Sequence, residues 1–235
     1  MTITEMAVVM LILGIIVAAT ATLSIGFTRT NAENTSRQTQ IDDARQAVER
    51  ISATLRTAVK PSQLVSCTQC GTVDAFTQGA DLSVQFYANF NNPGNSVGPS
   101  RVTYTVATSG AGAGVLVEKL QTPDFAQASS TGYSYCPAEA ANATSGCKSH
   151  LTVRRVAAGV QTGAPIFKYY DQAGNLLDTS QGGLVSGDLE KVLSIEVVLT
   201  VQSTEVTKPL PTTYIQRITL PNAEAVLRQD PGATP

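Results

Sequence analysis

Four cysteines are the residues of this chain whose type and spacing most directly suggest chemistry. Cys67 and Cys70 form a CxxC pair, and ten residues separate Cys136 from Cys147. In an oxidising compartment we expect two local disulfides, Cys67–Cys70 and Cys136–Cys147, because this pairing closes the least chain. Two alternatives stay open. A redox role for the CxxC pair needs a preceding strand and a following helix, and a four-cysteine zinc site needs two closely spaced pairs.

Oxygen ligands are grouped at one further place. Asp171, Asn175 and Asp178 surround a glycine, as the ligands of calcium loops do, which makes them a weak candidate calcium site. A hairpin turn explains the same residues equally well. His150 is the only histidine, and the dispersed carboxylates form no recognisable acid–base or nucleophile arrangement. We therefore predict no catalytic residue and no cofactor, and expect that the protein is not an enzyme.

One carboxylate, Glu5, stands at the head of a long apolar stretch. From Met6 to Phe27 the chain has no Asp, Glu, Lys, Arg or Pro, and a single helix needs about 20 apolar residues to cross a bilayer. A carboxylate at the edge of such a segment is costly unless a partner neutralises it. Glu5 is therefore a functional candidate. The simpler alternative is a carboxylate at the lipid headgroup level of an ordinary single-pass anchor.

The composition is that of a protein exposed outside the cell. Of the 235 residues, 16 are basic and 18 acidic, which gives a net charge of −2 and a charged fraction of 14%, below the roughly 25% of an average soluble domain. There is no basic patch, so nucleic acid is not expected as a specific ligand. No Lys or Arg precedes the apolar stretch, unlike in a newly made signal or anchor. We expect a mature chain whose basic leader has been removed.

The elements that position these residues begin with one long helix. Nothing breaks a helix between Thr2 and about Val59. We divide it into a hydrophobic transmembrane part, residues 1–27, and an amphipathic continuation, residues 28–60. The polar stretch 28–40 should bend or unwind if the segment leaves the lipid. Beyond it, apolar residues recur every three or four positions and predict one buried face: Ile41, Ala44, Val48, Ile51, Leu55 and Ala58.

A β-rich head domain, residues 61–222, is predicted after the helix, followed by a tail at 223–235. Its expected strands are short runs of β-branched and aromatic residues separated by turn clusters, at 82–88, 102–107, 114–120, 151–156, 166–170, 192–201 and 212–220. Strand 192–201 alternates apolar and polar residues, and 212–220 should pair with it antiparallel. The predicted fold class is α+β, in which the long N-terminal helix packs on an antiparallel sheet.

The opening residues, MTITEMAVVMLILGII, resemble the mature N-terminus of type IV pilins and type II secretion pseudopilins. The resemblance covers about the first 27 residues. It implies that a prepilin peptidase removes a leader after a glycine, that Met1 is N-methylated, and that Glu5 pairs with the N-terminal amine of a neighbouring subunit. Thr22 departs from the pattern, because many pilins have a proline there. VLSIEVVLTVQ, TTYIQRITL and FKYYDQAGNLL resemble the larger J-type minor pilins more weakly.

These residues together predict a structural subunit of a type IV pilus-like filament. Met1 and Glu5 would carry assembly, and the partners would be further copies, other pilins, the prepilin peptidase and the pilus assembly platform. The chain would lie in the cell membrane as a single-pass protein before assembly and in an extracellular filament afterwards. Alternatives are a minor pilin or pseudopilin of a tip or secretion complex, an anchored binding domain that never polymerises, and a thiol oxidoreductase of the cell envelope.

Overall fold

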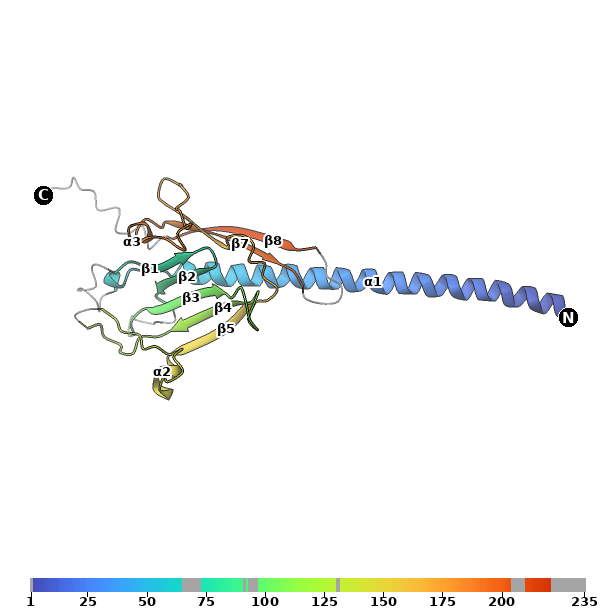
Figure 1. Cartoon of the computed structure of the whole chain (residues 1–235), viewed down its shortest axis with the longest axis horizontal. Coiled ribbons are helices and arrows are strands. Elements are labelled where there is room, and N and C mark those ends of the chain that lie inside the picture. Colours follow the sequence, from blue (N-terminus) through green and yellow to red (C-terminus); the bar gives the residue numbers. More distant parts are fainter. Residues whose placement is uncertain are drawn as a thin grey trace.

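A single helix, α1 (Ile3–Leu55), runs from the N-terminal end of the computed structural model into its head (Figure 1). The structure describes residues 2–64, 73–90, 92, 97–129, 132–203 and 210–220. The 53 residues of α1 form a rod about 80 Å long at 1.5 Å per residue. Its N-terminal end projects away from the head, while its C-terminal end lies among the strands (Figure 1).

The strands of the described residues form two antiparallel sheets. The five-stranded sheet has the order β1 (Phe76–Ala80), β2 (Ser83–Ala88), β3 (Ser100–Val106), β4 (Leu116–Gln121) and β5 (Leu151–Ala157). The three-stranded sheet has the order β6 (Phe167–Tyr170), β7 (Ser194–Val201) and β8 (Thr212–Thr219). Short helical turns lie between strands: η1 (Pro61–Gln63), α2 (Ser145–Ser149) and α3 (Ser186–Leu189).

The alternation along individual strands explains their two faces. In β7, Ile195, Val197 and Leu199 are fully buried, whereas Glu196 and Val198 between them are partly exposed. Because successive side chains of a strand point to opposite faces, β7 turns a continuous apolar surface toward α1. Strand β8 pairs with β7 over its whole length in the predicted antiparallel arrangement. The predicted fold class, a long helix packed on antiparallel β structure, is confirmed.

The predicted helical stripe is the centre of the core. Ala44, Val48, Ile51 and Leu55 are fully buried, and α1 contacts β5, β7 and β8. Aromatic rings of the five-stranded sheet extend this core, with 6.4 Å between the ring centroids of Phe86 and Tyr104. Neither the amphipathic helix nor a single sheet could bury its apolar face alone.

The two sheets are also joined by their own backbone. Gln161 N donates to Thr200 O at 2.9 Å, and Gln202 N donates to Gly159 O at 2.9 Å. Gly159 has a φ of +70°, and a Cβ at this position would lie 2.1 Å from Gln202 O. Only glycine fits such a close approach. This contact, which we call the crossing of the two sheets, lies at the end of the head from which α1 emerges.

Candidate functional site

The N-terminus of α1 forms a capping box, and Glu5 is part of it. Thr2 N donates to Glu5 Oε2 at 2.8 Å, and Glu5 N donates to Thr2 Oγ1 at 3.4 Å. The extended backbone of Thr2, at φ −85° and ψ 154°, is the usual geometry of an N-cap. The carboxylate satisfies a free backbone N–H and lies at the positive end of the helix dipole. Glu5 therefore has a partner within its own helix.

The sequence contains a local signal for this box. A threonine followed three residues later by a glutamate, just before an apolar run, is the usual pattern of a capping box, and Thr2-Ile3-Thr4-Glu5 fits it. Met1 lies outside the described residues. The predicted pairing of Glu5 with a neighbour's N-terminal amine and the N-methylation of Met1 stay predictions.

The apolar part of α1 has no cover within the described chain. Every residue from Thr2 to Thr35 is exposed, including Leu23 at 76% and Phe27 at 73%. Monomeric soluble proteins rarely expose contiguous apolar patches larger than a few hundred Å². α1 is the only described helix that is long and apolar enough to cross a membrane. This surface needs lipid or protein around it.

Threonines in and after the apolar part satisfy their own hydroxyl groups. Thr20 Oγ1 donates to Ile16 O at 3.0 Å, and Thr22 Oγ1 donates to Ala19 O at 2.9 Å. Thr28, Thr30, Thr35 and Thr39 donate to carbonyls one turn earlier in the same way. A hydroxyl bonded to its own helix adds little cost in an apolar environment. α1 is continuous through residues 28–40, and the conditional unwinding there stays a prediction.

A partly buried ion pair clamps the packed half of α1 to the five-stranded sheet. Arg50 donates to both carboxylate oxygens of Glu118, from Nε at 3.0 Å and from Nη2 at 3.1 Å. Tyr104 Oη donates to Glu118 Oε1 at 2.5 Å, and Arg50 lies 5.3 Å from the ring centroid of Phe90. The hydrogen bond from Glu118 raises the pKa of Arg50. Burial, and then the hydrogen bond to Glu118, raise the pKa of Tyr104.

A cleft lies where α1 leaves the head, and we call it the throat cleft. Its volume is about 490 Å³, and its walls include Ser36, Gln40 and Asp43 on α1 and Gly159 and Val201 on the opposite side. Gln40 is only 3% exposed. Its amide nitrogen and oxygen have no hydrogen-bonding partner among the described residues. A buried polar group left unpaired costs about 1–3 kcal/mol, so Gln40 stands out in the polar stretch.

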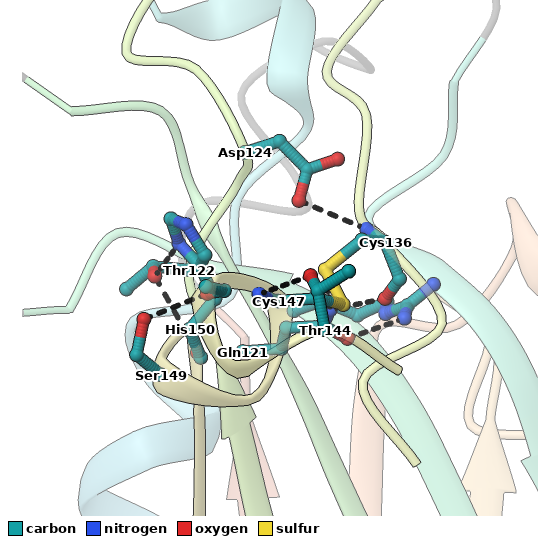
Figure 2. The surroundings of a disulfide bond; sticks show 10 residues. Gln121, Thr122, Asp124, Cys136, Thr144, Cys147, Ser149 and His150 are labelled. Atoms are coloured by element: carbon teal, nitrogen blue, oxygen red, sulfur yellow. Dashed lines mark hydrogen bonds between the residues drawn. A yellow bond between two sulfur atoms is a disulfide. The ribbon is translucent and has the colours of Figure 1, made fainter. Parts of the chain in front are cut away.

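The expected disulfide Cys136–Cys147 is present, with a Cα–Cα distance of 5.9 Å (Figure 2). The backbone around it is held by hydrogen bonds: Cys136 N donates to Asp124 Oδ1 at 3.0 Å, and Gln121 Nε2 donates to Cys136 O at 2.6 Å. A disulfide leaves neither sulfur as a free thiolate ligand, so a site built from four cysteines does not fit. Cys67 and Cys70 lie outside the described residues, and their pairing stays a prediction.

His150 also contributes to the hydrogen bonds around the disulfide. Its Nδ1 lies 3.0 Å from Thr122 Oγ1, at the end of β4 and close to the disulfide (Figure 2). No carboxylate is among its hydrogen-bonding partners within the described residues. This position gives His150 a local structural contact.

The weak calcium candidate folds as a turn in which the carboxylates are already engaged. Asp171 Oδ1 accepts from Asn175 N at 2.7 Å, and Asp171 Oδ2 accepts from Asn175 Nδ2 at 3.0 Å. Asp178 accepts from the backbone N–H and the hydroxyl of Ser180. These bonds lower the pKa of both carboxylates. Within the described residues, no group of three His, Cys, Asp or Glu side chains could hold a metal ion.

Comparisons of this chain with models of protein families, with curated proteins and with solved structures found no match. The functional argument therefore rests on the residues described above. Three features carry it: the exposed apolar half of α1, the carboxylate at its start, and the clamp that holds its other half on the head.

Proposed function

We propose that this chain is a structural subunit of a type IV pilus-like filament, assembled through the apolar half of α1. The observation that carries the proposal is the exposure of every residue from Thr2 to Thr35 on a helix whose other half is fixed in a folded head. Before assembly, lipid would cover this surface. In the filament, the apolar halves of α1 from further copies would cover it, and the heads would form the outer surface.

The pairing of Glu5 supports an ordered arrangement of the copies. A charged N-terminal amine of one copy can neutralise Glu5 of the next inside an apolar bundle. A carboxylate left unpaired there is strongly unfavourable, so the pair favours one axial position of neighbouring helices. The disulfide in the head suits an extracellular location.

A second candidate is a single-pass anchored domain that does not polymerise. The capping box favours it, because the box gives Glu5 a function in an isolated helix. The two candidates make different demands on Glu5. Filament assembly needs its charge, whereas the capping box also accepts a glutamine at this position.

The substitution Glu5→Gln separates the two candidates. Under the filament proposal, it lowers the yield of filaments sheared from native cells by about tenfold or more, as expected when one partner of a buried charge pair is lost. The measurement is electron microscopy and an immunoblot of the sheared fraction, normalised to the chain in the membrane fraction. Glu49→Gln is the matched control, because Glu49 is an exposed glutamate in the packed half of the same helix, outside the surface proposed for assembly.

Equal filament yields for Glu5→Gln and Glu49→Gln would contradict pairing through the Glu5 charge. Absence of filaments from cells that hold the wild-type chain in their membranes would favour the anchored domain. Intact mass and N-terminal sequencing of the native protein then test processing. A removed leader ending in glycine and a methylated Met1 are the expected result.

A further inference from the structure

The throat cleft has the features of a binding site that the described residues of the isolated chain do not fill. It offers a buried amide, that of Gln40, which can both donate and accept hydrogen bonds and has no partner among the described residues. Asp43 adds a carboxylate to the same wall. A matching group would donate and accept hydrogen bonds, and it would carry a positive charge near Asp43.

The position of the cleft limits what can reach it. Its lining on α1 begins at Ala32, only five residues after Phe27, where the apolar stretch ends. Any copy of the chain that packs against the apolar half of α1 therefore passes close to the cleft. Its wall of Gly159 and Val201 belongs to the rigid crossing of the two sheets.

The length of the apolar stretch sets which part of a second copy lies there. Met6–Phe27 has 22 residues, about 33 Å of helix. If two parallel copies bury at least half of this length on each other, their axial offset is at most about 11 residues. The neighbour's residues level with Gln40 then fall between 29 and 40. Further along, one face of the neighbour's helix is buried against its own head, beginning with Ala44, Ala47 and Val48.

We propose that the throat cleft receives the polar segment Thr28–Gln40 of a second copy of this chain. The inference rests on the proposed function, since it needs parallel copies packed along their apolar halves. Gln40 and Asp43 are the receiving groups. The contact at the cleft thereby sets the distance between neighbouring heads along the filament. The pairing of Glu5 sets the axial position of the copies at the other end of the helix.

The chemistry of the polar segment matches the cleft. It is exposed before Ser36 and contains amide side chains at Asn31 and Asn34 and guanidinium groups at Arg29 and Arg37. An amide pairs with the amide of Gln40 through one donor and one acceptor on each side. Arg37 and Asp43 take part in none of the ion pairs within the described part of the chain. They are the oppositely charged groups that would pair between copies.

Photo-cross-linking in assembled filaments tests this contact. A photoreactive amino acid at Thr39, which lines the cleft, is incorporated into the full chain in native cells, and sheared filaments are irradiated. We expect a covalent dimer whose cross-linked peptide lies within residues 28–40 of the second copy. The control places the same amino acid at Thr213, which is exposed on the three-stranded sheet, and should give no cross-link to that segment.

A charge exchange gives an independent readout. Asp43→Arg places two like charges together, and Arg37→Asp does the same with Asp43, so each single variant should lower filament yield by about tenfold. The double variant Asp43→Arg/Arg37→Asp restores the opposite charges and should recover most of the yield. A purely structural role for either residue predicts additive losses in the double variant.

The outcomes separate this inference from the proposed function. Filaments that form normally but give a cross-link to another segment, or none, overturn the contact and leave the filament intact. A cross-link to a lipid or to another small molecule, without a dimer, shows a different occupant and also overturns it. Wild-type cells without filaments overturn the proposed function, and this inference with it.

Discussion

Ile16 and Ile51 are the same residue in the same helix, but Ile16 is 55% exposed and Ile51 is fully buried. The difference divides α1 into two regions. From Ser36 onward, the helix is held by the core and by the Arg50–Glu118 clamp. Before Ser36, it is held only by its own backbone and its capping box. Full burial of an isoleucine contributes about 1.5–3 kcal/mol, so a large favourable free energy is gained when lipid or protein covers the first region.

The two halves of α1 differ in what they contact. The packed half gives the head a fixed orientation on the rod, while the exposed half keeps its apolar surface available. The two halves should therefore respond differently to the same substitution. Stability of the full chain in detergent measures the packed half, and under the proposed function filament yield measures the exposed half.

The largest effect on stability is expected at the clamp. Arg50→Met leaves Glu118, which is 3% exposed, as a buried carboxylate without its cation, and this should lower the free energy of unfolding by about 3–5 kcal/mol. The measurement is denaturant unfolding of the full chain in detergent, followed by near-UV circular dichroism. Arg45→Met is the control, because the Arg45–Glu49 pair is exposed and its loss should change nothing measurable. Equal effects of the two substitutions would refute the clamp.

The next effect compares the two isoleucines directly. Ile51→Ala removes a fully buried side chain and should lower the free energy of unfolding by about 2–5 kcal/mol. Ile16→Ala should leave the stability of the head unchanged in detergent, because no described side chain covers Ile16 in the isolated chain. The same unfolding measurement serves for both. A loss of head stability in Ile16→Ala would show that the two halves are coupled.

The smallest effect concerns alkaline pH and the tyrosine of the clamp. The pKa of Tyr104 is raised in the folded protein, mainly by burial. Its contribution to stability is therefore fully present below the unfolded pKa near 10 and is lost as the pH rises above that value. Between pH 9 and pH 11 the wild type should lose about 1.4 kcal/mol more than Tyr104→Phe, which has no group to titrate there. An identical pH dependence of the two proteins would show that Tyr104 ionises freely in the folded state.

Much of the fold follows from local patterns. The spacing of Ala44, Val48, Ile51 and Leu55 predicts the buried helical face, and the alternation in 192–201 predicts β7. Both signals depend only on the period of a helix or a strand. The strand β1 (Phe76–Ala80) was not predicted, because its sequence, FTQGA, combines a glycine with a single large apolar residue. The division into two sheets was also not predicted, since alternation within a strand does not specify its neighbours.

The candidate site was predicted less completely, because its contacts join distant residues. Arg50 and Glu118 are 68 positions apart, and no local pattern indicates that they meet. The burial of Gln40 is imposed by the crossing at Gly159, in a stretch whose composition predicts an exposed helix. The capping box of Thr2 and Glu5, in contrast, is a local pattern, and its four-residue signal is sufficient to predict it.

The disulfide Cys136–Cys147 has a further consequence for the integrity of the chain. It encloses ten residues, 137–146, most of them exposed, with Glu139 as the only charged residue between the two cysteines. A protease that cuts within this ring opens it without separating the two parts, since the sulfur–sulfur bond still joins them. A cut at Lys148, just outside the ring, has no such safeguard. The loop is thus the one described stretch of the surface where a broken peptide bond leaves a single covalent molecule.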